Sequence, residues 1–167
     1  ANALTKLKEK QPIKAVVLDL RGNTGGLLTE AVNVANVFLE KGAMVVQIKG
    51  RDKENQQVFR TLNTPVDTQI PLCVLIDRSS ASASEIVAGA LQDLDRAVIV
   101  GQRSYGKGLV QNTRDLSFGA KVKLTTARYF IPSGRCIQAL KYENGKPHQI
   151  QDSLHTPYQT AGGRPVY

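Results

Sequence analysis

The chain has 167 residues, of which 41% are hydrophobic and 22% are charged, and its formal net charge is +8. This length suits one domain with a core of its own, and the apolar fraction excludes a disordered tail. No apolar run reaches the ~18 residues that a membrane-spanning helix needs. The only two cysteines, Cys73 and Cys136, lie far apart, which excludes a disulfide framework and a cysteine metal centre.

The charge balance raises the question of a nucleic-acid partner, because the pI is about 9.7. The basic residues are spread along the chain, and the one dense group is Lys6, Lys8, Lys10 and Lys14. Tryptophan is absent and aromatic residues make up only 5%, so side chains for base stacking are scarce. We therefore interpret the charge as a solvated basic surface and expect no nucleic-acid partner.

The N-terminal part of the chain predicts two helices and three strands. Apolar residues recur at helical spacing over residues 27–41, and residues 2–9 are typical of a helix end. The run 15–20 is rich in β-branched residues and predicts a buried strand, and 44–49 with 57–61 fits a hairpin.

The following part repeats the order strand, turn, helix, strand. Buried strands are predicted at 72–77 and 97–100, with a helix over 83–94 between them, and a second hairpin is expected from 109–116 and 122–130. This order predicts an α/β fold built from βαβ units and β-hairpins.

The last part is polar and rich in turn residues. We expect a core over residues 1–140, followed by a polar tail or truncated element over 141–167. Both histidines, His148 and His155, fall in this last segment, so a serine nucleophile in the core is expected to lack a histidine partner.

Three turns that follow predicted strands could carry chemistry, because ligand sites in such sheets gather at the carboxyl ends of strands. The first is 21–26 (RGNTGG), whose glycines let backbone amides approach a ligand closely. A tight turn that only starts a helix explains the same residues equally well.

The second turn, 79–85 (SSASASE), places serines between a strand and a helix. The amide after such a serine lies at a helix N-terminus, where it can stabilise an oxyanion. Ser82 with Glu85 also fits a capping box, which needs no catalysis and is favoured when this turn is considered alone. The residue types leave open which of Ser80, Ser82 and Ser84 would be the nucleophile.

The third turn, 101–108 (GQRSYGKG), nearly matches a nucleotide-binding phosphate loop. Gly108 stands where a hydroxyl must bind Mg²⁺, and residues 109–113 predict a strand where that motif requires a helix. A nucleotide site is therefore disfavoured.

Lys107 in this turn is the remaining candidate for a general base. A lysine acts as a base near neutral pH only if its pKa falls by about 3 units, which burial can achieve. Gln111 would face the same side as Lys107 in an extended segment and could orient the amine. The alternative is an ordinary solvated surface lysine.

Together these blocks resemble one family. Residues 17–26 (VLDLRGNTGG), 80–86 (SASASEI) and 105–111 (YGKGLVQ) are similar, in the same order, to signature blocks of the carboxyl-terminal processing (tail-specific) serine proteases. The similarity spans about residues 14–138. It implies a Clp-protease/crotonase-like α/β core.

The resemblance also implies roles for particular residues. Ser82 matches the nucleophile, Lys107 the general base and Gln111 the residue that positions this base, and the backbone amides of Gly26 and Ala83 match the oxyanion hole. It implies a serine endopeptidase with a Ser-Lys dyad that cleaves protein substrates near their carboxyl termini, with no metal or organic cofactor.

The chain departs from the family in having no PDZ domain and no export signal, so we interpret it as a catalytic-core fragment. The resemblance implies a parent protein in the periplasm or cell envelope. Two alternatives stay open: a non-catalytic peptide-binding module that holds a chain terminus by backbone amides, and an acyl-thioester enzyme of the crotonase type.

Overall fold

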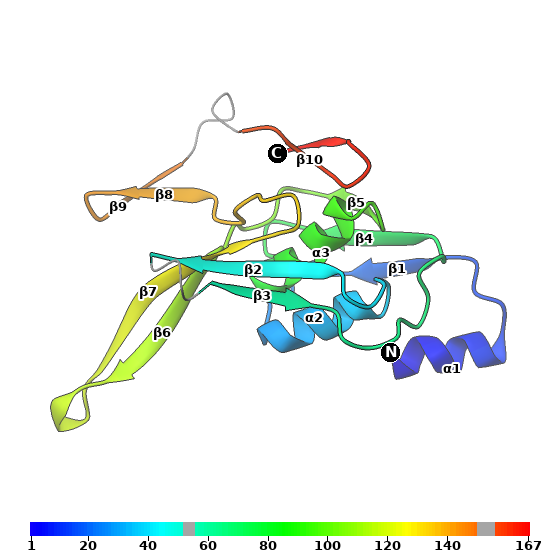
Figure 1. Ribbon diagram of the computed structural model, residues 1–167, viewed down its shortest axis with the longest axis horizontal. Coiled ribbons are helices and arrows are strands. Elements are labelled where there is room, and N and C mark those ends of the chain that lie inside the picture. The colour runs from blue at the N-terminus through cyan, green and yellow to red at the C-terminus, as the bar shows by residue number, and fades with distance from the viewer. Residues whose placement is uncertain (52–55, 150–155) are drawn as a thin grey trace.

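A computed structural model describes residues 1–51, 56–149 and 156–167 (Figure 1). Its first sheet is parallel and has the order β1-β4-β5, formed by β1 (Val16–Asp19), β4 (Leu72–Ile76) and β5 (Val98–Gly101). The parallel pairing confirms the predicted βαβ units. It also brings the turns that follow these three strands to one edge of the sheet.

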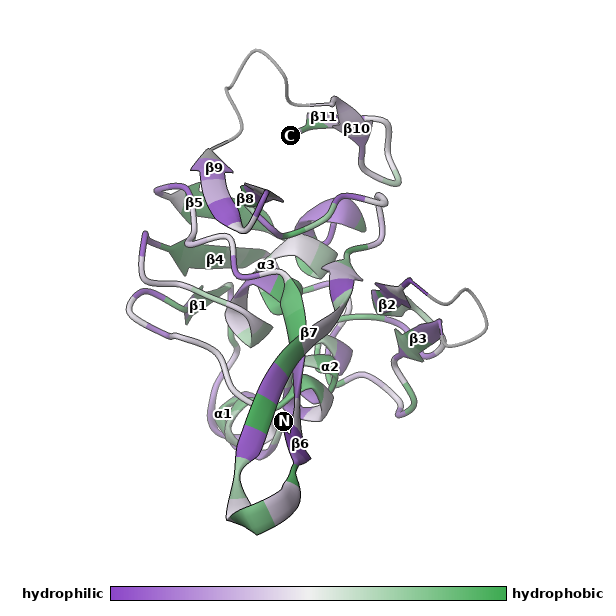
Figure 2. Ribbon diagram, turned by 90° about the vertical axis from the view of Figure 1, so that its left-hand side faces the viewer, coloured by the Kyte–Doolittle hydropathy of each residue, from purple (hydrophilic) through white to green (hydrophobic). Residues whose placement is uncertain are grey.

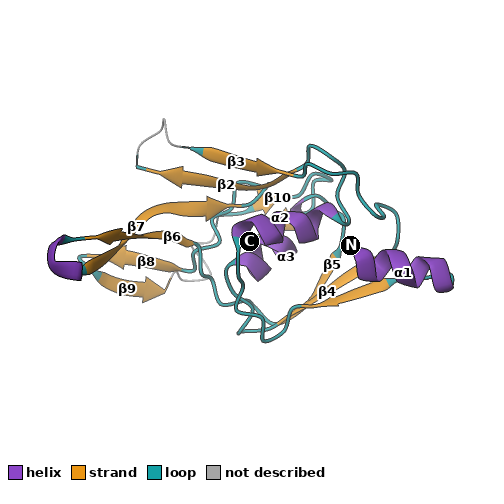
Figure 3. Ribbon diagram, turned by 90° about the horizontal axis from the view of Figure 1, so that it is seen from below, coloured by secondary structure: helices purple, strands orange, loops and turns teal. Residues whose placement is uncertain are grey.

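Two helices pack against this sheet and bury its inner face. They are α2 (Leu28–Asn36) and α3 (Ala83–Asp93), and Figure 3 shows them on the same side of β4 and β5. Ala35, Leu91 and Val74 are fully buried between these elements. The third helix, α1 (Asn2–Lys10), buries none of its residues completely. Among the described residues, no helix is long and apolar enough to cross a membrane.

α2 ends earlier than the apolar spacing predicts. The buried side chain of Asn36 donates to the carbonyl of Asn63 at 2.8 Å and accepts the amides of Leu62 and Asn63. Asn36 thereby anchors the loop that follows β3 to the end of the helix. A long-range polar contact, and not helix propensity, sets this boundary.

The second sheet is antiparallel and has the order β3-β2-β7-β6. Both predicted hairpins are present, one from β2 (Met44–Gly50) and β3 (Gln57–Arg60), the other from β6 (Leu109–Asp115) and β7 (Lys121–Phe130). Pairing of β2 with β7 joins them into one sheet. The far half of the β6–β7 hairpin, with the short helix η2 (Ser117–Gly119) at its tip, projects away from the body of the molecule (Figure 1).

Hydropathy follows this division of the molecule. Figure 2 shows apolar residues along β4 and polar residues along much of the projecting hairpin. Val45 and Val46 at the start of β2 are fully buried, whereas every residue from 111 to 121 is exposed. The body therefore holds the core, and the hairpin contributes nothing to it beyond its base.

The C-terminal segment forms short strand pairs, β8 (Leu140–Glu143) with β9 (Lys146–Gln149) and β10 (Tyr158–Gln159) with β11 (Pro165–Val166). The end of α3 holds the second pair, because the Ala161 amide donates to the Asp93 carbonyl at 2.7 Å and Arg164 pairs with Asp95. His148 lies in β9, and His155 lies outside the described residues.

Candidate active site

Hydrogen bonds join the turn after β1 to the turn after β4. The Gly22 amide donates to Asp77 at 3.0 Å, and the Ala81 amide donates to the Asn23 carbonyl at 3.0 Å. The side chain of Asn23 accepts the hydroxyl of Ser84 at 2.9 Å. The glycine-rich turn and the serine-rich turn are thus parts of one site.

Asp77 organises the start of the serine-rich turn. Besides Gly22, it accepts the amides of Ser79 at 2.9 Å and Ser80 at 3.0 Å. The Gly22 amide, more than any other group, holds the pKa of Asp77 below its usual range, and the Ser79 and Ser80 amides act in the same direction.

The three serines of the second turn differ in their surroundings. Ser80 is 0% exposed, and its hydroxyl donates to the Leu20 carbonyl at 2.7 Å and accepts the Asp77 amide at 2.9 Å. Ser84 is buried with its hydroxyl on Asn23. Ser82 is half-buried, and its hydroxyl accepts the Glu85 amide in the capping box but donates to no group among the described residues. Of the three hydroxyls, that of Ser82 is the one whose proton is not donated to another described group.

The backbone of Ser82 is in an unusual conformation, with φ 56° and ψ −114°. Such angles are strained for a residue with a Cβ and persist only where surrounding contacts fix them. Ser82 is the N-cap of α3, so its side chain sits on a sharp strand-to-helix turn at the positive end of a helix. In α/β-hydrolases the nucleophilic serine occupies a strained strand-to-helix turn.

The glycine-rich turn comes into direct contact with this serine. Gly25 has φ +95°, and a Cβ built on it would lie 2.6 Å from the Ala81 oxygen, 2.8 Å from the Ala83 nitrogen and 3.0 Å from the Ser82 Cβ. Only glycine fits such a position. Within the described part of the chain, the amides of Gly26 and Ala83 donate to no acceptor. Two unpaired N–H groups therefore accompany the hydroxyl of Ser82.

The buried carboxylate of Glu85 connects the serine turn to the lysine segment. Its four hydrogen bonds, two to each oxygen, come from the amides of Ser82 at 2.7 Å, Lys107 at 2.9 Å and Gly106 at 2.6 Å, and from the hydroxyl of Ser104 at 2.7 Å. The predicted capping box is present, but capping is only part of this role. The sequence signal for the rest is a carboxylate in the first turn of a helix whose next six residues are small or apolar.

Lys107 is placed by its backbone, and its side chain is exposed. The expectation of a buried amine in contact with Ser82 is wrong for this structure: among the described residues, the amine makes no hydrogen bond or ion pair. The cause is local. Lys107 lies in a loop, where its backbone amide donates to Glu85 and its side chain extends into solvent. The Lys107 and Ser82 amides share the same Glu85 oxygen, so the two backbones are neighbours.

Gln111 lies in β6, exposed, with its side-chain amide 3.5 Å from the Thr125 hydroxyl. β6 begins only at Leu109, and its register shifts between Val110 and Gln111. Strand alternation therefore does not relate the two side chains.

Two glycines allow the lysine segment to pack tightly. A Cβ on Gly106 would overlap Ala139, and a Cβ on Gly108 would overlap the backbone of Gln138. The Gly108 amide donates to the Gln138 side chain at 2.9 Å, and its carbonyl accepts the Tyr129 amide at 2.9 Å. The segment then continues as a strand, which agrees with rejecting a nucleotide-binding loop.

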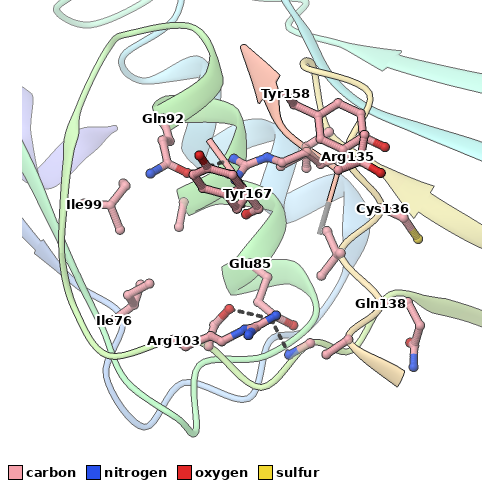
Figure 4. Close-up of a pocket in the computed structure, with 18 residues that line it drawn as sticks. Ile76, Glu85, Gln92, Ile99, Arg103, Arg135, Cys136, Gln138, Tyr158 and Tyr167 are labelled. Carbon is pink, nitrogen blue, oxygen red and sulfur yellow. Dashed lines mark hydrogen bonds between the residues drawn. The ribbon is translucent and has the colours of Figure 1, made fainter. Parts of the chain in front are cut away.

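A cavity of about 310 Å³ adjoins this region, and Glu85, Ser104 and Gly106 form part of its wall (Figure 4). Isoleucines supply much of the remaining lining, and Figure 4 shows Arg135 and Tyr167 at the end away from Glu85. Cys136 also lines it, and burial raises the pKa of this thiol. Ser82 and Lys107 are not among the lining residues, so this cavity lies behind the site.

Comparison with known proteins gives a consistent answer. The family model described as peptidase family S41 matches residues 1–145. The chain is 45% identical over 141 residues to the carboxy-terminal-processing protease of Bartonella bacilliformis, covering 83% of this chain and 32% of that protein. It is 41% identical over 154 residues to a Staphylococcus epidermidis protein named "Probable CtpA-like serine protease", covering 90% of this chain and 30% of that protein.

A solved structure is similar as well. The photosystem II D1 C-terminal processing protease superimposes with a TM-score of 0.75 at 40% identity, over 82% of this chain and 35% of that one. The chain thus spans about a third of the length of the relatives that it matches.

Proposed function

Since the chain belongs to peptidase family S41, with the Clp-protease/crotonase-like fold of that family, we propose that it carries the catalytic site of a serine endopeptidase. In this proposal, Ser82 is the nucleophile, Lys107 the general base, and protein substrates are cleaved near their carboxyl termini. The parent protein acts in the periplasm or cell envelope.

One observation carries this proposal above all. Ser82 combines a strained N-cap conformation, a hydroxyl whose proton is not donated to any described group, and two neighbouring amides without acceptors among the described residues, on Gly26 and Ala83. A carbonyl oxygen placed between these amides would be stabilised as it becomes an oxyanion. The amide of Ala83 is without an acceptor in the helix because it is the first helical residue, and the close approach of the glycine-rich turn adds the Gly26 amide beside it.

The reaction needs only groups of this chain and water. Ser82 Oγ attacks the scissile carbonyl carbon while its proton passes to the Lys107 amine, and the amides of Gly26 and Ala83 hold the oxyanion. As the intermediate collapses, Lys107 returns that proton to the leaving amine, and an acyl-enzyme forms on Ser82. Water then attacks the ester with Lys107 again as base, releasing the acid and restoring the serine.

Lys107 reaches Ser82 in this mechanism by rotation of its side chain. Its backbone is fixed by Glu85 next to the serine, and its four-carbon chain is free to swing from solvent. Closure over a bound peptide removes water from the amine, which favours its neutral form. Catalytic contacts are commonly longer before substrate binds than in the reacting complex. Gln111 is proposed to orient the amine in that closed state.

The test is covalent labelling combined with cleavage. The full-length protein is incubated with a fluorophosphonate, the modified residue is located by mass spectrometry, and cleavage of an unfolded protein is followed in parallel. We expect the adduct on Ser82, and loss of both signals in Ser82→Ala. An adduct on Ser80 or Ser84, or cleavage that survives in Ser82→Ala, contradicts the proposal.

The same assay separates the two alternatives. A peptide-binding module would bind the unfolded protein without any serine adduct. An enzyme of the crotonase type would turn over acyl thioesters with Ser82 removed.

A further inference from the structure

The far end of the β6–β7 hairpin exposes apolar side chains that no described part of the chain covers. Phe118 is fully exposed, at 106%, and Leu116 is 53% exposed. We call these two residues the hairpin tip. Phe118 also adopts φ 60°, a left-handed conformation that is uncommon for a bulky residue and that no packing within the chain compensates.

Three cations surround the hairpin tip. Arg114, Lys121 and Lys123 lie within four residues of η2, which at the rise of a strand is about 13 Å. The one acid among them, Asp115, is already paired with Lys121 at 2.7 Å. Within the described residues, Arg114 and Lys123 form no ion pair, so the tip region carries a net positive charge.

The faces of the hairpin differ from its tip. Its cross-strand pairs next to the turn are mainly polar, including Asp115 with Lys121 and Thr113 with Lys123. A protein groove that received this hairpin would find few apolar side chains along its length. Leu116 and Phe118 lie at the extremity with the cations behind them, and Leu124, 49% exposed, is the exposed large hydrophobic residue further along the strands.

We propose that the hairpin tip docks the protein on an anionic lipid bilayer, with Phe118 and Leu116 inserted among the headgroups. An amphipathic element of this kind binds by burying apolar side chains at the interface while its lysines and arginines attract anionic lipid. The projection of the hairpin from the body lets its tip reach a surface without collision (Figure 1). This proposal stands independently of the peptidase activity.

Vesicle sedimentation tests it. The protein is mixed with vesicles of phosphatidylcholine, or of phosphatidylcholine with phosphatidylglycerol, and the bound fraction is measured. We expect binding that depends on phosphatidylglycerol and weakens as salt approaches about 1 M, where the screening length falls to about 3 Å. Leu116→Ser with Phe118→Ser should weaken binding at least about tenfold, and Arg114→Gln or Lys123→Gln about fivefold each.

Leu62→Ser is the matched control, because Leu62 is 73% exposed and lies elsewhere on the surface. All these positions are exposed, so the variants keep the fold, which circular dichroism verifies. Absence of vesicle binding by the wild-type chain, or binding equal in wild type and the tip variant, overturns the proposal. So does an oligomer, seen by ultracentrifugation without lipid, that dissociates in the tip variant, since a second copy would then be the partner of the tip.

Discussion

The amides of Ser82 and Lys107 donate to the same oxygen of Glu85, at 2.7 and 2.9 Å. Two turns that are distant in the sequence are therefore aligned by one buried carboxylate. This places a requirement on Glu85 that a capping residue would not face: it must accept at both oxygens.

Glu85→Gln should separate alignment from helix capping. Glutamine keeps one acceptor oxygen, but it replaces the other with an NH₂ group, which donates and cannot accept from two N–H or O–H donors. We expect stability to fall by about 1–3 kcal/mol for each buried donor left unpaired, and the rate of Ser82 labelling to fall about 100-fold through misplacement of the lysine segment. Urea unfolding and labelling kinetics measure the two effects. Labelling as fast as in wild type would contradict an aligning role.

Gly25→Ala should disable the site through the backbone. A Cβ there would meet the Ala81 oxygen, the Ala83 nitrogen and the Ser82 Cβ, all at 3.0 Å or less. We expect labelling of Ser82 to disappear. Gly22→Ala is the control, since Gly22 also has positive φ (+70°) but open space around its Cβ position. It should lose only about 1–2 kcal/mol and keep its labelling. Equal effects of the two substitutions would show that contact with Ser82 is irrelevant.

Ser82 itself should be a strained residue. Glycine accepts φ 56° with little cost, and it is also a tolerated N-cap. Ser82→Gly is therefore expected to be about 1 kcal/mol more stable than Ser82→Ala, although both abolish labelling. Thermal unfolding compares the stability of the two variants. A more stable alanine variant would contradict the inference that the backbone of Ser82 is strained.

The strands and helices themselves were largely predictable. β4, α3 and β6 were each predicted to within one residue at both ends, because buried apolar runs and helical spacing are local signals. The C-terminal strand pairs were not predicted. The pair of β10 and β11 is held by Asp93, Asp95 and Arg135 through contacts distant in sequence.

The candidate site was predictable in part. The resemblance indicated Ser82 among three serines, and only the structure shows that Ser80 and Ser84 are committed to Leu20 and Asn23. The exposure of the Lys107 side chain could not be predicted, because its backbone is held by Glu85, which becomes its neighbour only in the folded chain. The role of Glu85 beyond helix capping was not predictable, because its partners at 104–107 become its neighbours only in the folded chain.

Asp67 should make stability depend on pH. It accepts Lys8 at 2.6 Å and the amides of Gln69 and Ile70 at 2.8 Å, and these bonds, that of Lys8 foremost, lower its pKa from 3.8 to about 2. A folded-state pKa below the unfolded value stabilises the protein above about pH 4, and the contribution is lost as the pH falls toward 2. Urea titrations across this range should give a shallower pH dependence in Asp67→Asn. An unchanged slope would mean that the ion pair is not formed in solution.

The most direct test of the account is the rate of peptide cleavage in five proteins: wild type, Ser82→Ala, Lys107→Ala, Lys107→Arg and the double variant Ser82→Ala/Lys107→Ala. Acylation of Ser82 is measured in the three of them that keep the serine. If the two side chains act as one unit, removing either should reduce peptide cleavage as much as removing both, and arginine should not restore it because it stays protonated. Wild-type acylation in Lys107→Ala would show that the serine reacts without this amine.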